Sequence, residues 1–138
     1  MTKITGSCLC RAVRYSIDGA PVTTRYCWCR VCQYYGAGNA TISACFKRDT
    51  VTIEGETKDY VSVAHSGSIM HRRFCATCGT QMFSEAEQRP HLIFVRVGTF
   101  DNPELTRPIA SIWTSSAPHW ACIDEGLPRI EGQPPPAA

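Results

Sequence analysis

Cysteine is the residue type in this sequence with the clearest potential for chemistry. The 138-residue chain has nine cysteines, and seven of them fall in three closely spaced groups. Thiolates at such spacings are ligands that zinc accepts readily. The groups are a C-x-C pair, a C-x-C-x-x-C set and a C-x-x-C pair followed by glycine: Cys8 and Cys10; Cys27, Cys29 and Cys32; Cys75, Cys78 and Gly79.

The thiols are expected to be reduced rather than paired in disulfides. The first six residues, MTKITG, lack the apolar segment of a secretory signal, and no run approaches the ~20 apolar residues of a membrane helix. We therefore expect a cytoplasmic protein without a membrane partner. In the cytoplasm thiols stay reduced, so the cysteines are expected to serve metal binding or catalysis rather than disulfides. The odd number of cysteines also leaves at least one outside any fully paired scheme.

The spacing within each pair suits a metal better than a disulfide. In an extended segment, Cys8 and Cys10 point to the same side with Cα atoms about 6.6 Å apart. That separation and the parallel Cβ directions disfavour a disulfide, whereas zinc spans such thiolates easily. At Cys75 and Cys78, a turn aims both sulfurs inward, and Gly79 permits the positive φ that such a turn often needs.

Cys8 and Cys10 together with Cys75 and Cys78 form a closed four-thiolate set. Bringing them together closes a long loop, at a cost of about 4 kcal/mol in chain entropy. Structural zinc contributes about 10–16 kcal/mol, which exceeds that cost. We therefore predict a structural zinc that joins the start of the chain to its middle. A thioredoxin-like redox role for Cys75 and Cys78 is disfavoured, because the surroundings lack a βαβ pattern.

The remaining group has three thiolates, which is the ligand number of a catalytic zinc with one open position. We predict that Cys27, Cys29 and Cys32 hold such a zinc. The alternative is that a further cysteine or a histidine closes the site and makes it structural. The candidates for that role are Cys45, Cys122, His65, His71, His91 and His119. The apolar neighbours of Cys45 and Cys122 indicate ordinary buried thiols.

The charge of the chain argues against nucleic acid as a partner. The net charge is only +2, and the longest basic run is residues 71–73, beside a cysteine pair. Three arginines could offset thiolate charge or bind a substrate carboxylate, with a solvated surface position as the alternative: Arg30, Arg72 and Arg73. Trp28 and Trp113 could line a pocket or belong to the core.

Short strands with alternating apolar residues dominate the rest of the sequence, and they predict a mainly β domain of curved antiparallel or mixed sheets with little helix. Residues 92–97 are nearly continuously apolar, which indicates a central strand, and residues 30–35 favour one helical turn. We expect one domain over residues 1–132 and a Pro-rich, surface-lying tail over residues 133–138. The other expected strands are 13–17, 40–46, 51–53, 60–63 and 109–113.

The joint cysteine pattern resembles that of the GFA family, the glutathione-dependent formaldehyde-activating enzymes, also called the CENP-V/GFA domain family. The resemblance covers nearly the whole chain. One departure is Trp28, which stands where relatives often have histidine. The similar segments are GSCLCRAVRY at residues 6–15, CWCRVCQ at 27–33, FCATCGTQMF at 74–83, IWT at 112–114 and DEGLPR at 124–129.

This resemblance implies an Mss4-like fold and the same division of the cysteines, with a structural and a catalytic zinc. It also implies formation of S-hydroxymethylglutathione from formaldehyde and glutathione, so that the partners are a glutathione-type thiol and a small carbonyl compound. Three thiolates give the zinc site a formal charge of −1, which weakens a Lewis acid, so we expect activation of the substrate thiol. The competing interpretation is a non-catalytic zinc module that binds a protein partner.

Overall fold

The computed structural model describes residues 3–136, which form ten strands and one short α-helix, α1 (Arg30–Tyr35). Short 3-10 turns connect some of the strands: η1 (Arg48–Thr50), η2 (Val97–Thr99), η3 (Pro103–Leu105) and η4 (Thr114–Ser116). The strands are β1 (Ile4–Ser7), β2 (Arg14–Ile17), β3 (Thr23–Cys27), β4 (Thr41–Lys47), β5 (Val51–Glu54), β6 (Thr57–Val63), β7 (Ile69–Cys75), β8 (Gln81–Ala86), β9 (Leu92–Arg96) and β10 (Ala110–Ile112).

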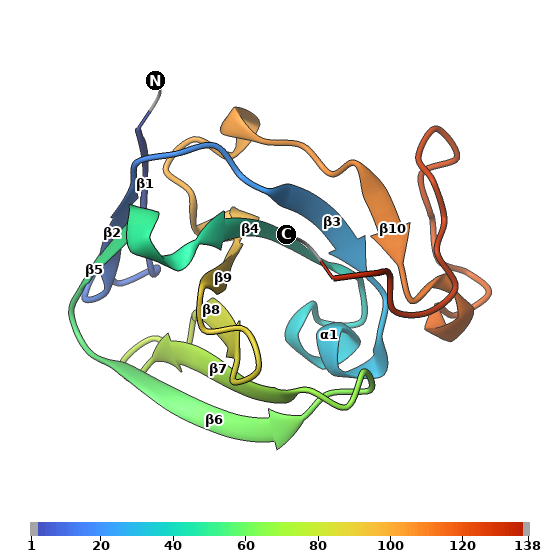
Figure 1. Cartoon of the computed structure of the whole chain (residues 1–138), viewed down its shortest axis with the longest axis horizontal. Helices are drawn as coiled ribbons and strands as arrows, with labels where there is room; N and C mark the ends of the chain where they lie inside the picture. The colour runs from blue at the N-terminus through green and yellow to red at the C-terminus, as the bar shows by residue number, and fades with distance from the viewer. Residues whose placement is uncertain (1–2, 137–138) are drawn as a thin grey trace.

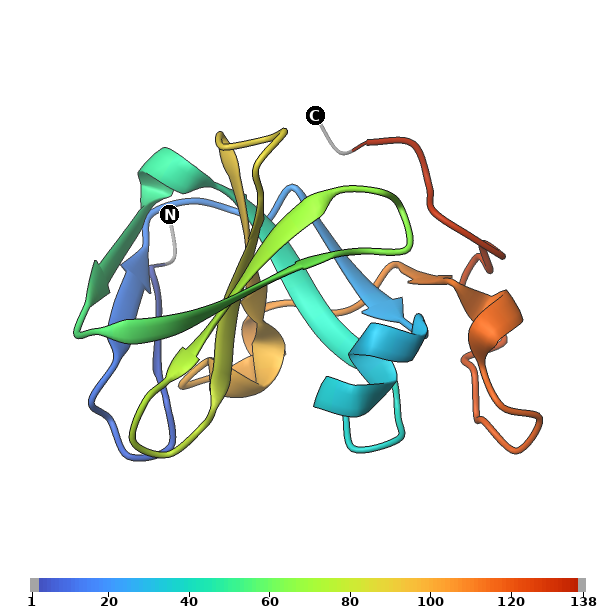
Figure 2. The ribbon, with the colours of Figure 1, turned by 90° about the horizontal axis from the view of Figure 1, so that it is seen from below.

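The strands form two sheets (Figure 1). The small sheet has the order β1-β2-β5 and is antiparallel. The large sheet has the order β10-β3-β4-β9-β8-β7-β6 and is antiparallel except where β10 runs parallel to β3. The large sheet curves strongly, so that β3 lies across from β7 with α1 beside them (Figures 1 and 2), and residues of both strands line one cavity. The expected mainly β architecture with mixed sheets and little helix is confirmed.

The core lies between the small sheet and one face of the large sheet. Alternate residues of β4 and β9 point into it, including Phe46, Ile93 and Val95, each 0% exposed. Tyr15 from β2 packs edge-on against Phe83 at a centroid distance of 5.5 Å. Since side chains alternate along a strand, the other face of the same strands is free to line a cavity.

The alternation pattern found some strands and missed others. The expected strands correspond to β2, β4, β5, β6, β9 and β10, and the expected turn is α1 over Arg30–Tyr35. β9 is the central strand of the large sheet, as predicted. The sequence interpretation missed β1, β3, β7 and β8 because polar residues break their apolar periodicity; in β3 and β7, Arg25 and Arg72 line the cavity.

The described part of the C-terminal segment, residues 133–136, returns toward β3 and β4 (Figure 1) and lines this cavity. Pro134 is buried, and the indole Nε1 of Trp113 donates a hydrogen bond to Gln133 Oε1 at 3.0 Å. None of the helices in the described part of the chain is long and apolar enough to cross a bilayer.

Candidate metal centres and the adjoining cavity

Four sulfur atoms from two distant parts of the chain converge where the small sheet meets the β7–β8 turn. The Sγ atoms of Cys8, Cys10, Cys75 and Cys78 all lie within 4.8 Å of one another. The Cys10 Sγ lies 3.7 Å from both the Cys8 and the Cys75 Sγ. Two zinc–sulfur bonds of about 2.3 Å at a tetrahedral angle hold their sulfurs about 3.8 Å apart, so the spacing fits zinc. It is too long for a disulfide, whose sulfurs lie about 2.0 Å apart.

The first pair of this cluster sits on a turn rather than on an extended segment, so the expectation of extended geometry was wrong. β1 ends at Ser7, and the chain folds back with Arg11 in the left-handed region at φ 69°. The backbone N–H of Val13 donates to the Cys8 Sγ at 3.3 Å. A turn aims both sulfurs at β7 equally well, since the sulfurs need only converge.

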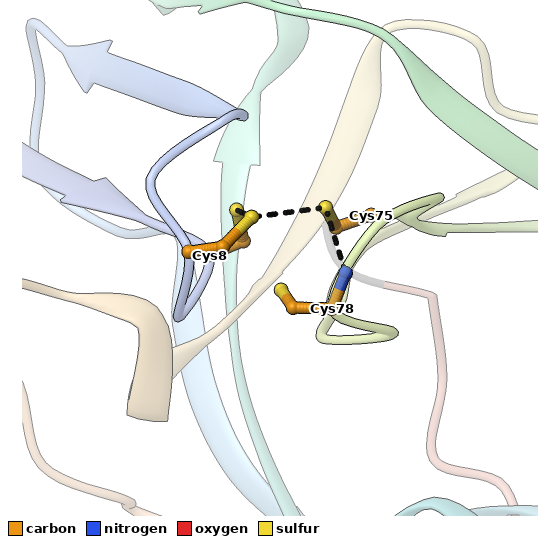
Figure 3. Close-up of side chains that lie close together, drawn as sticks. Cys8, Cys75 and Cys78 are labelled. Carbon is orange, nitrogen blue, oxygen red and sulfur yellow. Dashed lines mark hydrogen bonds between the residues drawn. The ribbon is translucent and has the colours of Figure 1, made fainter.

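The second pair sits on the tight β7–β8 turn (Figure 3). Two backbone N–H groups, of Thr77 and Cys78, donate to the Cys75 Sγ and lower the pKa of the Cys75 thiol. Gly79 follows with φ 77°, as the sequence predicted. The Thr80 hydroxyl lies 3.1 Å from the Cys78 Sγ, and this hydrogen bond contributes most to lowering the Cys78 pKa to about 5. The turn therefore favours thiolates before any metal binds.

The second cluster is built where β3 leads into α1. The Sγ atoms of Cys27, Cys29 and Cys32 lie within 4.8 Å of one another. Cys27 ends β3, Cys29 is the N-cap of α1, and Cys32 lies in its first turn. The Cys29 Sγ accepts the backbone N–H of Cys32 at 3.3 Å, which fixes the loop between them.

The side chain of Gln33 fixes the loop of residues 27–32 through hydrogen bonds to backbone carbonyl groups. Its side chain is buried, and its amide Nε2 donates to the carbonyl oxygens of Trp28 and Ser116 at 2.7 and 3.0 Å. The Gln33 Oε1 accepts from Arg30 Nη1 at 2.5 Å. Gln33 thus ties the cysteine loop to η4, 83 residues further along the chain. Its polarity gave no indication of this role in the sequence.

Within the three-sulfur cluster, one thiol is strongly acidified. Hydrogen bonds from the thiols of Cys27 and Cys29 lower the pKa of Cys32 to about 2, and the positive charge of Arg96 acts in the same direction. Hydrogen bonds with Cys29, and then with Cys32, raise the pKa of Cys27. A thiolate at Cys32 is the form of the side chain that a zinc ion requires.

In residues 3–136, no other histidine, cysteine, aspartate or glutamate joins this three-thiol group. His71, one of the residues considered as a fourth ligand, lies between Asp59 and Glu87. His65 lines the cavity beside the cluster and packs edge-on against Trp113. Cys45 is a buried thiol, as expected, but Cys122 is exposed, so the prediction that it is buried was wrong. The apolar neighbours of Cys122 lie in a surface loop outside the core.

The three thiols open onto a cavity of about 340 Å³ on the concave face of the large sheet. Thr41, the cross-strand partner of Cys27, lines it, and its buried Oγ1 has no hydrogen-bond partner in the described structure. Trp113, Pro134 and Pro135 form part of the rim. Trp28 does not line this cavity, because its side chain is buried on the other side of the loop.

Arginine is the charged residue of this cavity. Of the three arginines that the sequence singled out, Arg72 lines it, whereas Arg73 pairs with Glu85 at 3.2 Å and Arg30 stacks on Tyr34. Sequence reasoning missed three others: Arg25, Arg89 and Arg96. Burial lowers the pKa of Arg25. Arginines placed singly on β3 and β9, and just beyond β8, give no local signal, because only the curvature of the sheet brings them together.

The fold and the two groups of thiols define a class: a curved β domain that carries two cysteine sites able to bind metal. Residues 3–116 match the family model described as glutathione-dependent formaldehyde-activating enzyme, GFA, and this range includes all seven clustered cysteines. The chain belongs to the GFA family, as its cysteine pattern predicted.

A solved structure supports the fold independently. The crystal structure of a Rhodobacter sphaeroides protein is similar to this chain with a TM-score of 0.57 and 22% sequence identity. The similarity covers 75% of this chain and 96% of the other. At this identity the likeness concerns the fold alone.

Proposed function

We propose that this protein is a zinc-dependent enzyme that forms or cleaves the carbon–sulfur bond between a thiol and a small aldehyde, of the kind joining glutathione and formaldehyde. The family description supports this reaction class, since it names glutathione and formaldehyde. The observation that carries the proposal is the opening of the Cys27, Cys29 and Cys32 cluster onto a cavity large enough for a small molecule.

In this proposal the two clusters have different roles. Cys8, Cys10, Cys75 and Cys78 hold a structural zinc, because four thiolates complete its tetrahedral shell. Cys27, Cys29 and Cys32 hold the catalytic zinc, because three thiolates leave one position for substrate. The 3.7 Å sulfur separations support zinc at the first site, and the acidified Cys32 supports metal binding at the second.

The chemistry is the addition of a thiol to a carbonyl. When bound, the zinc favours the thiolate form of the substrate thiol. In the addition the sulfur–carbon bond forms, the carbon–oxygen π pair moves to oxygen, and the proton from the thiol ends on that oxygen. Cleavage is the reverse, so neither direction needs an oxidant or reductant.

The residues of the cavity supply orientation and exclusion of water. The buried Thr41 hydroxyl lines the cavity beside Cys32, where it contributes to the lowered pKa of that thiol and can also donate a hydrogen bond to the substrate oxygen. Trp113 and residues 133–136 also line the cavity, where they can limit the access of water to the reacting atoms. Exclusion of water strengthens the electrostatic interactions inside a site.

The test is a titration of the zinc-loaded protein with glutathione, followed by NMR with labelled formaldehyde. We expect thiol binding at millimolar concentration or below and faster exchange between free formaldehyde and its glutathione adduct. Cys29→Ser should abolish both effects, and the exposed Cys122→Ser should leave both intact. Absence of thiol binding at millimolar concentration would favour the non-catalytic zinc module with a protein partner.

A further inference from the structure

The cavity beside Cys27, Cys29 and Cys32 carries positive charge that no carboxylate side chain of the described residues neutralises. Four arginines line it, together with one histidine, and none of its lining residues is an aspartate or glutamate. Every ion pair found in residues 3–136 lies elsewhere, so none of the four arginines has an acidic partner there. The four are Arg25, Arg72, Arg89 and Arg96.

Arg72 is the most informative of the four. It is only 5% exposed, and its Nη1 donates to the hydroxyl of Ser62 on the neighbouring strand β6. A buried guanidinium without a carboxylate is costly, because a hydroxyl neutralises none of its charge. Such a charge is expected where a bound anion completes the site.

Arg96, half-buried on the central strand β9, also has no carboxylate partner among the described residues. Its Nη1 donates to Ser43 Oγ at 2.8 Å, while its buried Nε has no hydrogen-bond partner in the described structure. Its guanidinium stacks over the ring of Tyr35 at 5.8 Å, which fixes its plane. A guanidinium held in one plane is suited to bidentate binding of a carboxylate or phosphate.

The charge balance remains positive with metal bound. Zinc with three thiolates carries a formal charge of −1, and the four arginines contribute +4, which leaves +3 for the ligand to offset. Glutathione has two carboxylates but also an ammonium group. Among the described residues that line this cavity, four are arginines and none has a carboxylate that could pair with that ammonium.

We propose that the cavity selects a thiol that bears two or more anionic groups and no ammonium group, in preference to a zwitterionic thiol such as glutathione. This inference rests on the proposed thiol–carbonyl chemistry and specifies its substrate class. Arg72 and Arg96 bind the anionic groups and the three-thiolate site receives the sulfur. The cavity volume of about 340 Å³ accommodates such a molecule.

The test compares four probes by calorimetry on the zinc-loaded protein. Mercaptosuccinate has a thiol and two carboxylates, glutathione adds an ammonium, cysteamine has a thiol and an ammonium, and succinate has two carboxylates alone.

We expect mercaptosuccinate to bind at least about tenfold more tightly than glutathione, which is about 1.4 kcal/mol. Cysteamine should bind most weakly, and succinate should compete with mercaptosuccinate. Glutathione binding as tightly as mercaptosuccinate would overturn the proposal. Inorganic phosphate, used in place of succinate, distinguishes phosphate from carboxylate recognition.

Arg72→Met tests the assignment of the anion site. We expect mercaptosuccinate and succinate to lose about tenfold in affinity, with cysteamine unchanged or tighter. The melting temperature of the ligand-free variant should equal or exceed that of the wild type, because an unpaired buried charge has been removed. The matched control is Arg73→Met on the opposite face, which should leave every affinity unchanged. Unchanged succinate affinity in Arg72→Met would contradict the anion site, and Arg72→Lys should restore part of the loss.

Cobalt(II) in place of zinc separates this inference from the proposed function. Binding of a thiol to the metal should change the cobalt–thiolate absorption bands, whereas succinate should not. If mercaptosuccinate binds through Arg72 without changing these bands, the anion site stands and the thiol chemistry fails. If the bands change equally with all three thiols at equal affinity, the thiol chemistry stands and the selection for anions fails.

Discussion

The charged side chains on the two faces of strand β7 differ in their partners. On the face away from the cavity, His71 lies between Asp59 and Glu87, and Arg73 pairs with Glu85. On the cavity face, Arg72 has only a hydroxyl partner. Neighbouring residues of β7 therefore have different roles. The ion pairs of His71 and Arg73 stabilise the sheet, whereas Arg72 is available to bind an anionic ligand.

The His71 contacts make stability dependent on pH. Its Nδ1 lies 2.5 Å from Asp59 Oδ2 and its Nε2 lies 2.7 Å from Glu87 Oε2. Both ring nitrogens must carry protons to donate, so Asp59, and then Glu87, raise the His71 pKa. A raised pKa in the folded state gives stability that is complete below the unfolded value of about 6.5 and is lost as the pH rises through the folded value.

His71→Gln should therefore lower the melting temperature more at pH 5.5 than at pH 9. Arg73 and Glu85 lie on the same sheet face as His71, and subtracting the wild-type melting temperature at each pH cancels the contributions of these and other groups. Thermal melts of the wild type and the variant at several pH values measure this difference in melting temperature. A difference in melting temperature that is constant with pH would show that folding does not raise the His71 pKa.

Short turns and one short helix position the thiols, and each depends on a particular residue. At the β7–β8 turn this residue is Gly79, with φ 77°. No atom lies within 4 Å of a Cβ added there, so its requirement is conformational rather than steric. At the start of α1 it is Gln33, whose amide bonds to two buried carbonyl groups.

Gly79→Ala should destabilise the fold by about 1–2 kcal/mol, the cost of a left-handed conformation for a residue with a Cβ. Urea unfolding of the zinc-loaded protein measures this cost. The control is Gly98→Ala, where a Cβ also meets no neighbour but φ lies outside the left-handed region, and it should be neutral or slightly stabilising. Equal effects of the two substitutions would exclude the backbone argument.

Gln33→Leu should cost about 1–3 kcal/mol, because it leaves the carbonyl oxygens of Trp28 and Ser116 without their donor. It should also speed the release of one zinc to a chelator, since the loop between Cys27 and Cys32 loosens. Arg30→Ala removes an exposed partner of Gln33 and the stacking of Arg30 on Tyr34, leaves both carbonyl contacts of Gln33 in place and should have a much smaller effect. Zinc release at the wild-type rate in Gln33→Leu would refute the positioning role.

Sequence reasoning succeeded where chemistry is local and failed where it depends on curvature. The spacing of the cysteines was sufficient to group Cys8 and Cys10 with Cys75 and Cys78, because sulfur ligands must converge. The helical turn was predicted at residues 30–35, directly before the glycine-rich residues 36–38, and α1 (Arg30–Tyr35) lies there. Arg25 and Arg96 could not be predicted, because they meet only after β3 and β9 join the same curved sheet through β4.

At the scale of the whole molecule, the first thiol cluster joins the small sheet to the large one. Cys8 and Cys75 are both buried members of the core cluster, and they come from the loop after β1 and the end of β7. The second cluster lies on the far side of the large sheet, beside the cavity. Loss of metal should therefore have unequal consequences: loss from the first site separates the sheets, whereas loss from the second leaves the core intact.

The most direct measurement is the number of zinc ions per chain, with circular dichroism, for the wild type and two single variants. We predict two zinc ions for the wild type, about one for Cys29→Ser with the fold retained, and unfolding or aggregation for Cys75→Ser. A folded Cys75→Ser protein or an unfolded Cys29→Ser protein would contradict the division into a structural and a catalytic site.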